Sequence, residues 1–91
     1  MNTFSPELRV SYRRGVPYAA YYHLSAHKAG ASVRTELVEP GMVIGFDAAD
    51  RPLGIEITAP SLTTLEAFNE ALVRLGFASA TAGELAPLRA A

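Results

Sequence analysis

The sequence contains no cysteine, and this absence excludes whole classes of chemistry. Without cysteine the chain can form no disulfide bond, offer no thiolate nucleophile and build no zinc site of the cysteine type. No apolar run approaches the roughly 20 residues of a membrane-spanning helix. The N-terminal stretch MNTFSPELRV lacks the basic region and apolar stretch of a secretory signal. We therefore expect a cytoplasmic protein without a membrane segment.

An excess of charge of either sign is also missing. Eight Lys and Arg residues face nine Asp and Glu residues, for a formal net charge of −1, and Lys28 is the single lysine. This balance gives no long-range field that would attract nucleic acid. The sequence also lacks a Gly-x-Ser-x-Gly motif and a phosphate-binding glycine loop before a helix. We predict a non-enzymatic protein without catalytic residues, cofactor or metal.

What the sequence does contain is a regular alternation of apolar and polar residues. With 49% hydrophobic and 19% charged residues, the 91-residue chain has the composition of one globular domain. A period of two residues is typical of half-buried β-strands. It predicts five short strands, over residues 8–13, 18–24, 33–39, 42–47 and 53–58.

The acidic stretch between the last two of these strands is interpreted as a chain reversal. Asp47 can begin a turn by accepting backbone N–H groups through its side chain. Asp50 can take the left-handed conformation that follows, which Asp tolerates better than most residues. Both aspartates then serve the turn and not a reaction.

A helix is predicted after the strands, from apolar residues at three- and four-residue steps. Thr63 and Glu66 fit a capping box, with Ser61 as the competing cap, and Gly76 is placed to end the helix. The apolar stripe consists of Leu65, Phe68, Leu72 and Leu75. The fold class is therefore α+β: an antiparallel sheet of four to five short strands with one C-terminal helix packed on one face. Residues 1–77 form the domain, and the Ala-rich residues 78–91 form a flexible tail.

Two stretches carry a family resemblance: YYHLS, residues 21–25, and VIGFDAADRPLGIEI, residues 43–57. Together they resemble the small bacterial proteins of the domain-of-unknown-function family numbered 2283. The resemblance covers about residues 8–61 and is strongest at Gly54-Ile55-Glu56-Ile57. It implies a small accessory protein that binds a partner. The chain departs from the family pattern at Tyr18, Gly45 and Asp50.

Three residues are candidate functional residues by themselves: Glu56, His23 and His27. Glu56 alternates with Ile55 and Ile57, so we expect its side chain on the face opposite the helix. There it could contact a partner or act as an acid, but a surface pair with a cross-strand arginine such as Arg34 is favoured. His23 and His27 have the i, i+4 spacing of helical zinc ligands, yet they are expected in a strand and a loop, so no metal site is predicted.

The remaining candidates form a surface on the helix-free face of the sheet. Its aromatic and basic residues could stack on and neutralise single-stranded nucleic acid, which is the alternative hypothesis. The same residue types are enriched in protein interfaces, and apolar residues on this face would otherwise meet water. We therefore favour a homodimer that also binds a protein partner. The candidate interaction surface consists of Arg9, Arg13, Tyr21, His23, Arg34, Val38, Val43 and Glu56.

Overall fold

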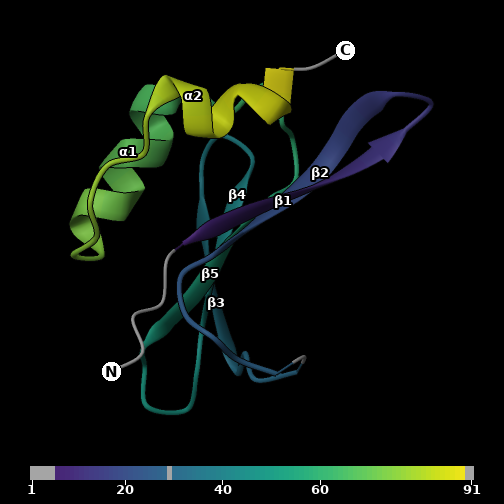
Figure 1. Ribbon diagram of the computed structural model, residues 1–91. Coiled ribbons are helices and arrows are strands. Elements are labelled where there is room, and N and C mark those ends of the chain that lie inside the picture. The colour runs from purple at the N-terminus through teal and green to yellow at the C-terminus, as the bar shows by residue number, and fades with distance from the viewer. Residues whose placement is uncertain (1–5, 29, 90–91) are drawn as a thin grey trace.

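The computed structural model describes residues 6–28 and 30–89 (Figure 1). Five antiparallel strands form one sheet in the order β1-β2-β5-β4-β3, and helical segments follow them in the chain. This confirms the predicted α+β fold class. The elements are β1 (Glu7–Arg13), β2 (Val16–His23), β3 (Arg34–Val38), β4 (Met42–Phe46), β5 (Pro52–Ile57), α1 (Leu65–Arg74), α2 (Ala82–Leu85) and the 3-10 helix η1 (Ala86–Arg89).

One face of the sheet supplies most of the hydrophobic core. The side chains of Met42, Ile44, Ile55 and Ile57 on β4 and β5 are fully buried. These two strands lie inside the sheet, with β5 paired to β2 on its other side. The period-two pattern therefore has the expected cause: alternate side chains enter the core, and those between them face away.

Helix α1 packs its apolar stripe onto that face. Phe68 and Leu72 have no exposed surface, and the Phe68 ring meets the Tyr22 ring of β2 edge to face, 4.9 Å between centroids. Gly76, with φ of 88°, ends the helix as predicted. The N-cap differs from the prediction by one residue. Thr64 is the cap, and its hydroxyl accepts a 3.0 Å hydrogen bond from the Ala67 N–H.

Thr63, the predicted cap, is buried instead. Its hydroxyl lies 3.1 Å from the Ala59 carbonyl oxygen, to which it donates a hydrogen bond. The capping motif of two adjacent threonines is ambiguous in the sequence, and burial of the first one decides which caps the helix.

The C-terminal segment differs from the predicted flexible tail. Residues 82–89 form α2 and η1, and Leu85 and Leu88 are 5% and 4% exposed. Thr81 and Glu84 form a reciprocal capping box at the start of α2. The side chain of Asn69 on α1 bonds both the N–H and the carbonyl of Ala80, at 2.7 and 3.0 Å. The described part of the tail is thus folded onto the domain, and residues 90–91 lie outside the described residues.

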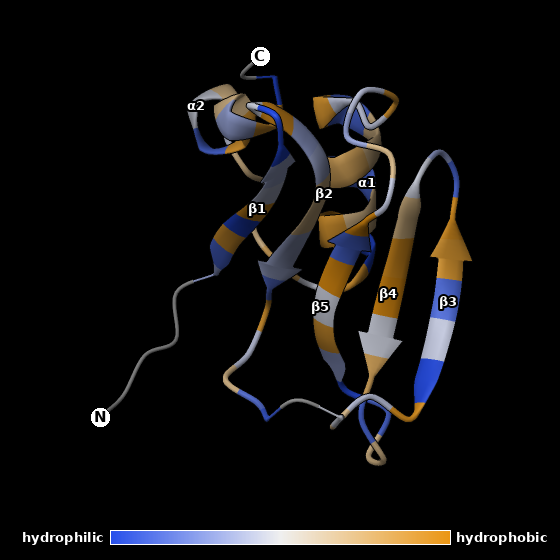
Figure 2. Ribbon diagram, turned by 90° about the vertical axis from the view of Figure 1, so that its right-hand side faces the viewer, coloured by the Kyte–Doolittle hydropathy of each residue, from blue (hydrophilic) through white to orange (hydrophobic). Residues whose placement is uncertain are grey.

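The width of the sheet explains why the tail is needed. Ten residues of helix are about 15 Å long and about 10 Å wide, whereas five strands span about 19 Å between the outermost axes. Helix α1 alone leaves part of the core face uncovered. The segment α2–η1 lies apart from α1 near the β1–β2 end of the sheet, and η1 packs against β2 (Figures 1 and 2).

Candidate functional site

The face of the sheet opposite the core carries most of the candidate residues. We call it the open face, and define it by Arg9, Tyr21, His23, Val43, Glu56 and Leu37. In Figure 2 α1 lies behind the strands, so this face is turned toward the viewer. The strand register aligns five of these residues in one row across the whole sheet. In order from β1 to β3 the row is Arg9, Tyr21, Glu56, Val43 and Leu37.

Arg13 stands apart from this row. It lies at the end of the β1–β2 hairpin, beyond the part of β2 that pairs with β5. Its guanidinium sits 5.0 Å from the centre of the Tyr18 ring. The structure therefore brings together Arg9, Tyr21, His23, Val43 and Glu56 of the predicted surface, but not Arg13.

The predicted placement of Arg34 and Val38 on this face is wrong. The guanidinium of Arg34 lies 4.0 Å from the centre of the ring of the core residue Phe46. Val38 pairs with the fully buried Met42 and packs against the core. Within β3 the set of Arg34, Glu36 and Val38 holds both charges, whereas Thr35 and Leu37 carry none, so the alternation favoured the wrong set for the inward side.

A groove on the open face is the candidate site. It has a volume of about 390 Å³. The small side chains of the cross-strand pair Ser11 and Ala19 contribute to its lining, together with larger polar side chains. The lining residues are Arg9, Ser11, Ala19, Ala20, Tyr21, His23 and Glu56.

Gly54 leaves the space that the Tyr21 phenol occupies in this region. A Cβ atom at Gly54 would lie 2.3 Å from the Tyr21 hydroxyl oxygen, so only glycine lets the phenol cross β5 at this point. The Tyr21 ring also meets the His23 ring edge to face, at 4.6 Å between centroids. The close approach of Tyr21 to Gly54 gives the glycine of the Gly-Ile-Glu-Ile motif a structural role.

His27 fixes the outer end of the phenol. Its Nδ1 lies 2.8 Å from the Ser25 carbonyl oxygen, which can only accept, so Nδ1 carries the proton. With the proton on Nδ1, Nε2 is the acceptor of the hydrogen bond that the Tyr21 hydroxyl donates, over 3.3 Å. His27 therefore acts as a support for Tyr21. No cluster of three or more His, Cys, Asp or Glu side chains suited to a metal occurs within residues 6–28 and 30–89.

The electrostatics of the groove leave two charges of opposite sign. Burial raises the pKa of Tyr21, and the nearby Glu56 carboxylate raises it further. Burial also lowers the pKa of His23, with His27 and Arg9 adding to the effect. At neutral pH the phenol is protonated and His23 is uncharged. Among the lining side chains Arg9 and Glu56 are then the charged groups, on either side of Tyr21, and Arg9 also forms an ion pair with Glu7 at 3.5 Å.

The predicted surface pair between Glu56 and Arg34 is not formed. Arg34 points to the other face, where its Nε donates to Asp50 over 3.0 Å. Among the described residues Glu56 has no ion-pair partner. The only described residues that neighbour it directly across the strands are Tyr21 and Val43. Glu56 is therefore an exposed acid bordered by apolar and aromatic surface.

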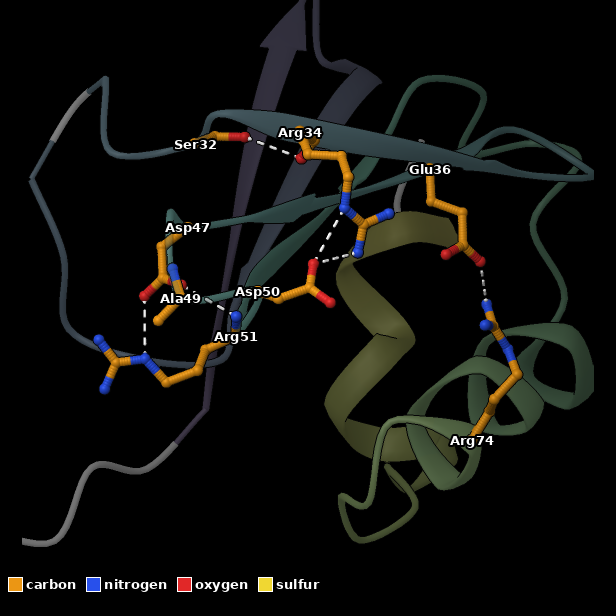
Figure 3. A network of polar contacts seen from close by, with 8 residues as sticks. All are labelled: Ser32, Arg34, Glu36, Asp47, Ala49, Asp50, Arg51 and Arg74. Carbon is orange, nitrogen blue, oxygen red and sulfur yellow. Dashed lines mark hydrogen bonds and ion pairs between the residues drawn. The ribbon is translucent and has the colours of Figure 1, made fainter.

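The turn between β4 and β5 is built as predicted (Figure 3). Asp47 Oδ1 accepts hydrogen bonds from the N–H groups of Ala49 and Arg51, each at 2.9 Å. Asp50 has φ of 65°, the left-handed conformation. The Arg51 N–H is the main cause that lowers the pKa of Asp47, and the Ala49 N–H and the Arg51 guanidinium add to it.

This lowered pKa predicts a specific loss of stability in acid. Because the folded-state pKa of Asp47 lies below the unfolded value of about 3.9, the stabilisation is complete above that value and is lost as pH falls through the folded pKa. The urea midpoint of the wild type is expected to fall across this window. Asp47→Asn keeps an acceptor oxygen but not the charge, so its midpoint should fall less. Parallel curves for the two proteins would contradict this role.

A larger cavity, which sequence reasoning missed, lies where the β2–β3 loop meets the end of α1. Its volume is about 680 Å³, and Leu53, Leu75 and Phe77 contribute apolar surface. Two of its charged groups, Asp47 and Arg51, already bind each other at 3.0 Å. The signals that could have suggested it, a basic loop residue and a helix end, are too common in sequences to single out a site.

Comparisons with protein-family models, with curated proteins and with solved structures each gave no match. Within the described residues, no helix is long and apolar enough to cross a lipid bilayer.

Proposed function

We propose that the chain is a non-enzymatic interaction module that binds a protein partner through the open face and that also associates with itself. The observation that supports partner binding is the groove around Tyr21, in which Arg9 and Glu56 place opposite charges on either side of a half-buried phenol. Tyrosine and arginine, with tryptophan, are the residue types most enriched among those that dominate binding energy at protein interfaces.

The rest of the row extends this surface with apolar side chains. Val43 is half-buried and Leu37 is 68% exposed, and both continue from Glu56 toward the β3 edge. An apolar strip that carries single charges of both signs suits a partner with complementary charges of its own. The proposal therefore predicts a protein surface and not a polyanion as the ligand.

Single-stranded nucleic acid is the second candidate. The Tyr21–His23 aromatic pair and the neighbouring Arg9 are the observations that favour it, since bases stack on aromatic rings and phosphates bind arginine. The carboxylate of Glu56 stands next to Tyr21 in the same row and would repel phosphates. For this reason we place the protein partner first.

A charge reversal in the groove separates the two candidates. Glu56→Arg is expected to reduce capture of partner proteins from a bacterial lysate at least tenfold, because it removes the acid that the partner's cation would meet. Glu66→Arg makes the same change at an exposed position on α1 and should capture as the wild type does. Unfolding midpoints would show that both variants are folded.

The two candidate ligands predict opposite effects of Glu56→Arg on binding. If the ligand is nucleic acid, Glu56→Arg binds a labelled single-stranded oligonucleotide more tightly than the wild type at low salt. If capture is the same for the wild type, Glu56→Arg and Tyr21→Ala, the groove is not the binding surface. Membership of family 2283, cytoplasmic location and the absence of enzymatic activity stay predictions.

A further inference from the structure

Strand β3 forms one edge of the sheet. Figure 2 shows it as the outermost strand, and no element among residues 6–28 and 30–89 lies beyond it on that side. Val33, just before the strand, and Leu37 within it are 67% and 68% exposed. A strand edge of this kind presents unpaired backbone N–H and C=O groups that can pair with another strand.

The opposite edge, β1, is protected differently. Its register with β2 shifts between Ser11 and Tyr12, and it carries the exposed charges of Glu7 and Arg9. Bulges and charges are the usual devices that block edge pairing. Strand β3 also holds two charges, but Arg34 and Glu36 both point to the core side, where they bind Asp50 and Arg74 (Figure 3).

The β3 sequence Val-Arg-Thr-Glu-Leu, residues 33–37, is complementary to itself. When two copies lie antiparallel about a two-fold axis at Thr35, Arg34 meets Glu36 of the second copy, and Val33 meets Leu37 of the second copy. Thr35 then meets its own equivalent. Opposite charges, apolar pairs and threonine pairs are the cross-strand combinations that stabilise antiparallel sheets. Each pair also occurs twice, as a two-fold interface requires.

The neighbouring registers are unfavourable. In an antiparallel pair, two residues directly opposite each other point their side chains to the same face of the sheet. If both α1 helices are to lie on one face of the joined sheet, the two-fold axis must therefore pass between a residue and its own equivalent in the second copy. Centring on Arg34 would place two arginines opposite each other, and centring on Glu36 would do so with two glutamates. Like charges directly opposite are destabilising. Among the three middle residues of the stretch, Thr35 alone gives a register without such a clash.

The existing ion pairs would extend across this interface. Within one chain, Arg34 Nε lies 3.0 Å from Asp50 Oδ1, and Arg74 Nη2 lies 2.8 Å from Glu36 Oε2. The side chains of Arg34 and Glu36 remain 48% and 37% exposed, so each has room for a second partner. When the two copies pair at Thr35, charges of alternating sign line up: Asp50 and Arg34 of one copy, then Glu36 and Arg74 of the second copy. The two-fold axis generates a second, equivalent row.

We propose that two copies of this chain pair through β3, antiparallel and centred on Thr35, to form one continuous ten-stranded sheet. This inference rests on the self-association stated in the proposed function and does not involve the groove around Tyr21. The partner is a second copy because the complementarity described above exists between β3 and itself.

Cysteine cross-linking tests the register directly. The chain has no cysteine, so an introduced thiol is unique. Two Thr35→Cys chains would face each other at the axis and are expected to form a disulfide-linked dimer on mild oxidation. Leu37→Cys, on the same face and edge, is the matched control. The two copies of residue 37 would be offset along the strands by four residues, roughly 13 Å. A disulfide needs Cα atoms within about 7 Å of each other. Equal cross-linking of both variants would overturn the register.

A charge exchange tests the pairing without cysteine. Arg34→Glu and Glu36→Arg each place like charges opposite each other, so each variant alone should raise the dimer dissociation constant at least tenfold in sedimentation equilibrium. An equimolar mixture restores both opposite-charge pairs and should recover the dimer. Circular dichroism would show that each variant keeps its sheet. Failure of the mixture to recover the dimer would overturn the proposal.

These results are independent of partner binding. A wild type that stays monomeric at high micromolar concentration overturns this inference and the self-association, but leaves the groove test unaffected. A wild-type dimer that Tyr21→Ala disrupts and that Thr35→Cys does not cross-link would place the interface on the open face instead.

Discussion

A chain that ends at Ala78 is expected to be largely unfolded at 37 °C. The deletion removes Leu85 and Leu88, which are 5% and 4% exposed and belong to the core. Burial of each leucine contributes about 1.5–3 kcal/mol, and the total stability of a small domain is about 5–15 kcal/mol. The deletion also removes the Ala80 backbone groups that bond the Asn69 side chain on α1.

Far-ultraviolet circular dichroism and urea unfolding would measure this loss. A milder form of the test is Leu88→Ala, which should lower the free energy of unfolding by about 2–5 kcal/mol. Leu62→Ala removes the same atoms from a side chain that is 61% exposed, and it should change stability little. If the shortened chain unfolds at the same urea concentration as the full chain, residues 79–91 do not belong to the folded domain.

Phe68→Ala is expected to lower the free energy of unfolding by about 3–5 kcal/mol. Phe68 has no exposed surface, and its ring is in edge-to-face contact with Tyr22 of β2. The alanine would remove this contact and leave a cavity between α1 and the sheet, because the surrounding strands are held by their hydrogen bonds and can collapse only in part. For a domain of this size, each kcal/mol lowers the Tm by roughly 4–8 °C.

Val73→Ala is the matched control on the same helix. Val73 is 61% exposed, so its truncation should change stability by less than about 0.5 kcal/mol. Phe68→Leu, which keeps most of the buried volume, should fall between the two. A Phe68→Ala variant as stable as Val73→Ala would mean that α1 does not rest on the sheet through this residue.

The strands, the helix and the β4–β5 turn could be predicted because their causes are local. Alternation places Ile55 and Ile57 in the core, and the carboxylate of Asp47 satisfies backbone groups two and four residues away. The order of the strands was not predicted. Strand β5, last in the chain, lies between β2 and β4, and no local pattern specifies which strands become neighbours.

The sequence assigned only some residues of the candidate surface to the correct face of the sheet, because that assignment also relies on a local pattern. Tyr21, His23 and Glu56 lie on strands in which one alternating set is clearly more apolar, so their face could be assigned. In β3 the uncharged set, Thr35 and Leu37, lies on the open face, and the placement of Arg34 on the core side depends on its contacts with Phe46 and Asp50. These partners come from other segments and have no signature within β3 itself.

The sequence by itself determined the strands, the main helix, the turn at Asp47 and the chemistry that the chain lacks. Each follows from residues within a few positions of one another, where periodicity and side-chain hydrogen bonds act. Only the tertiary structure decided which face β3 turns inward, that Gly54 seats Tyr21, and that the segment from Ala80 to Arg89 completes the core. Those outcomes depend on the area that other segments leave uncovered, and such an area exists only once the sheet is assembled.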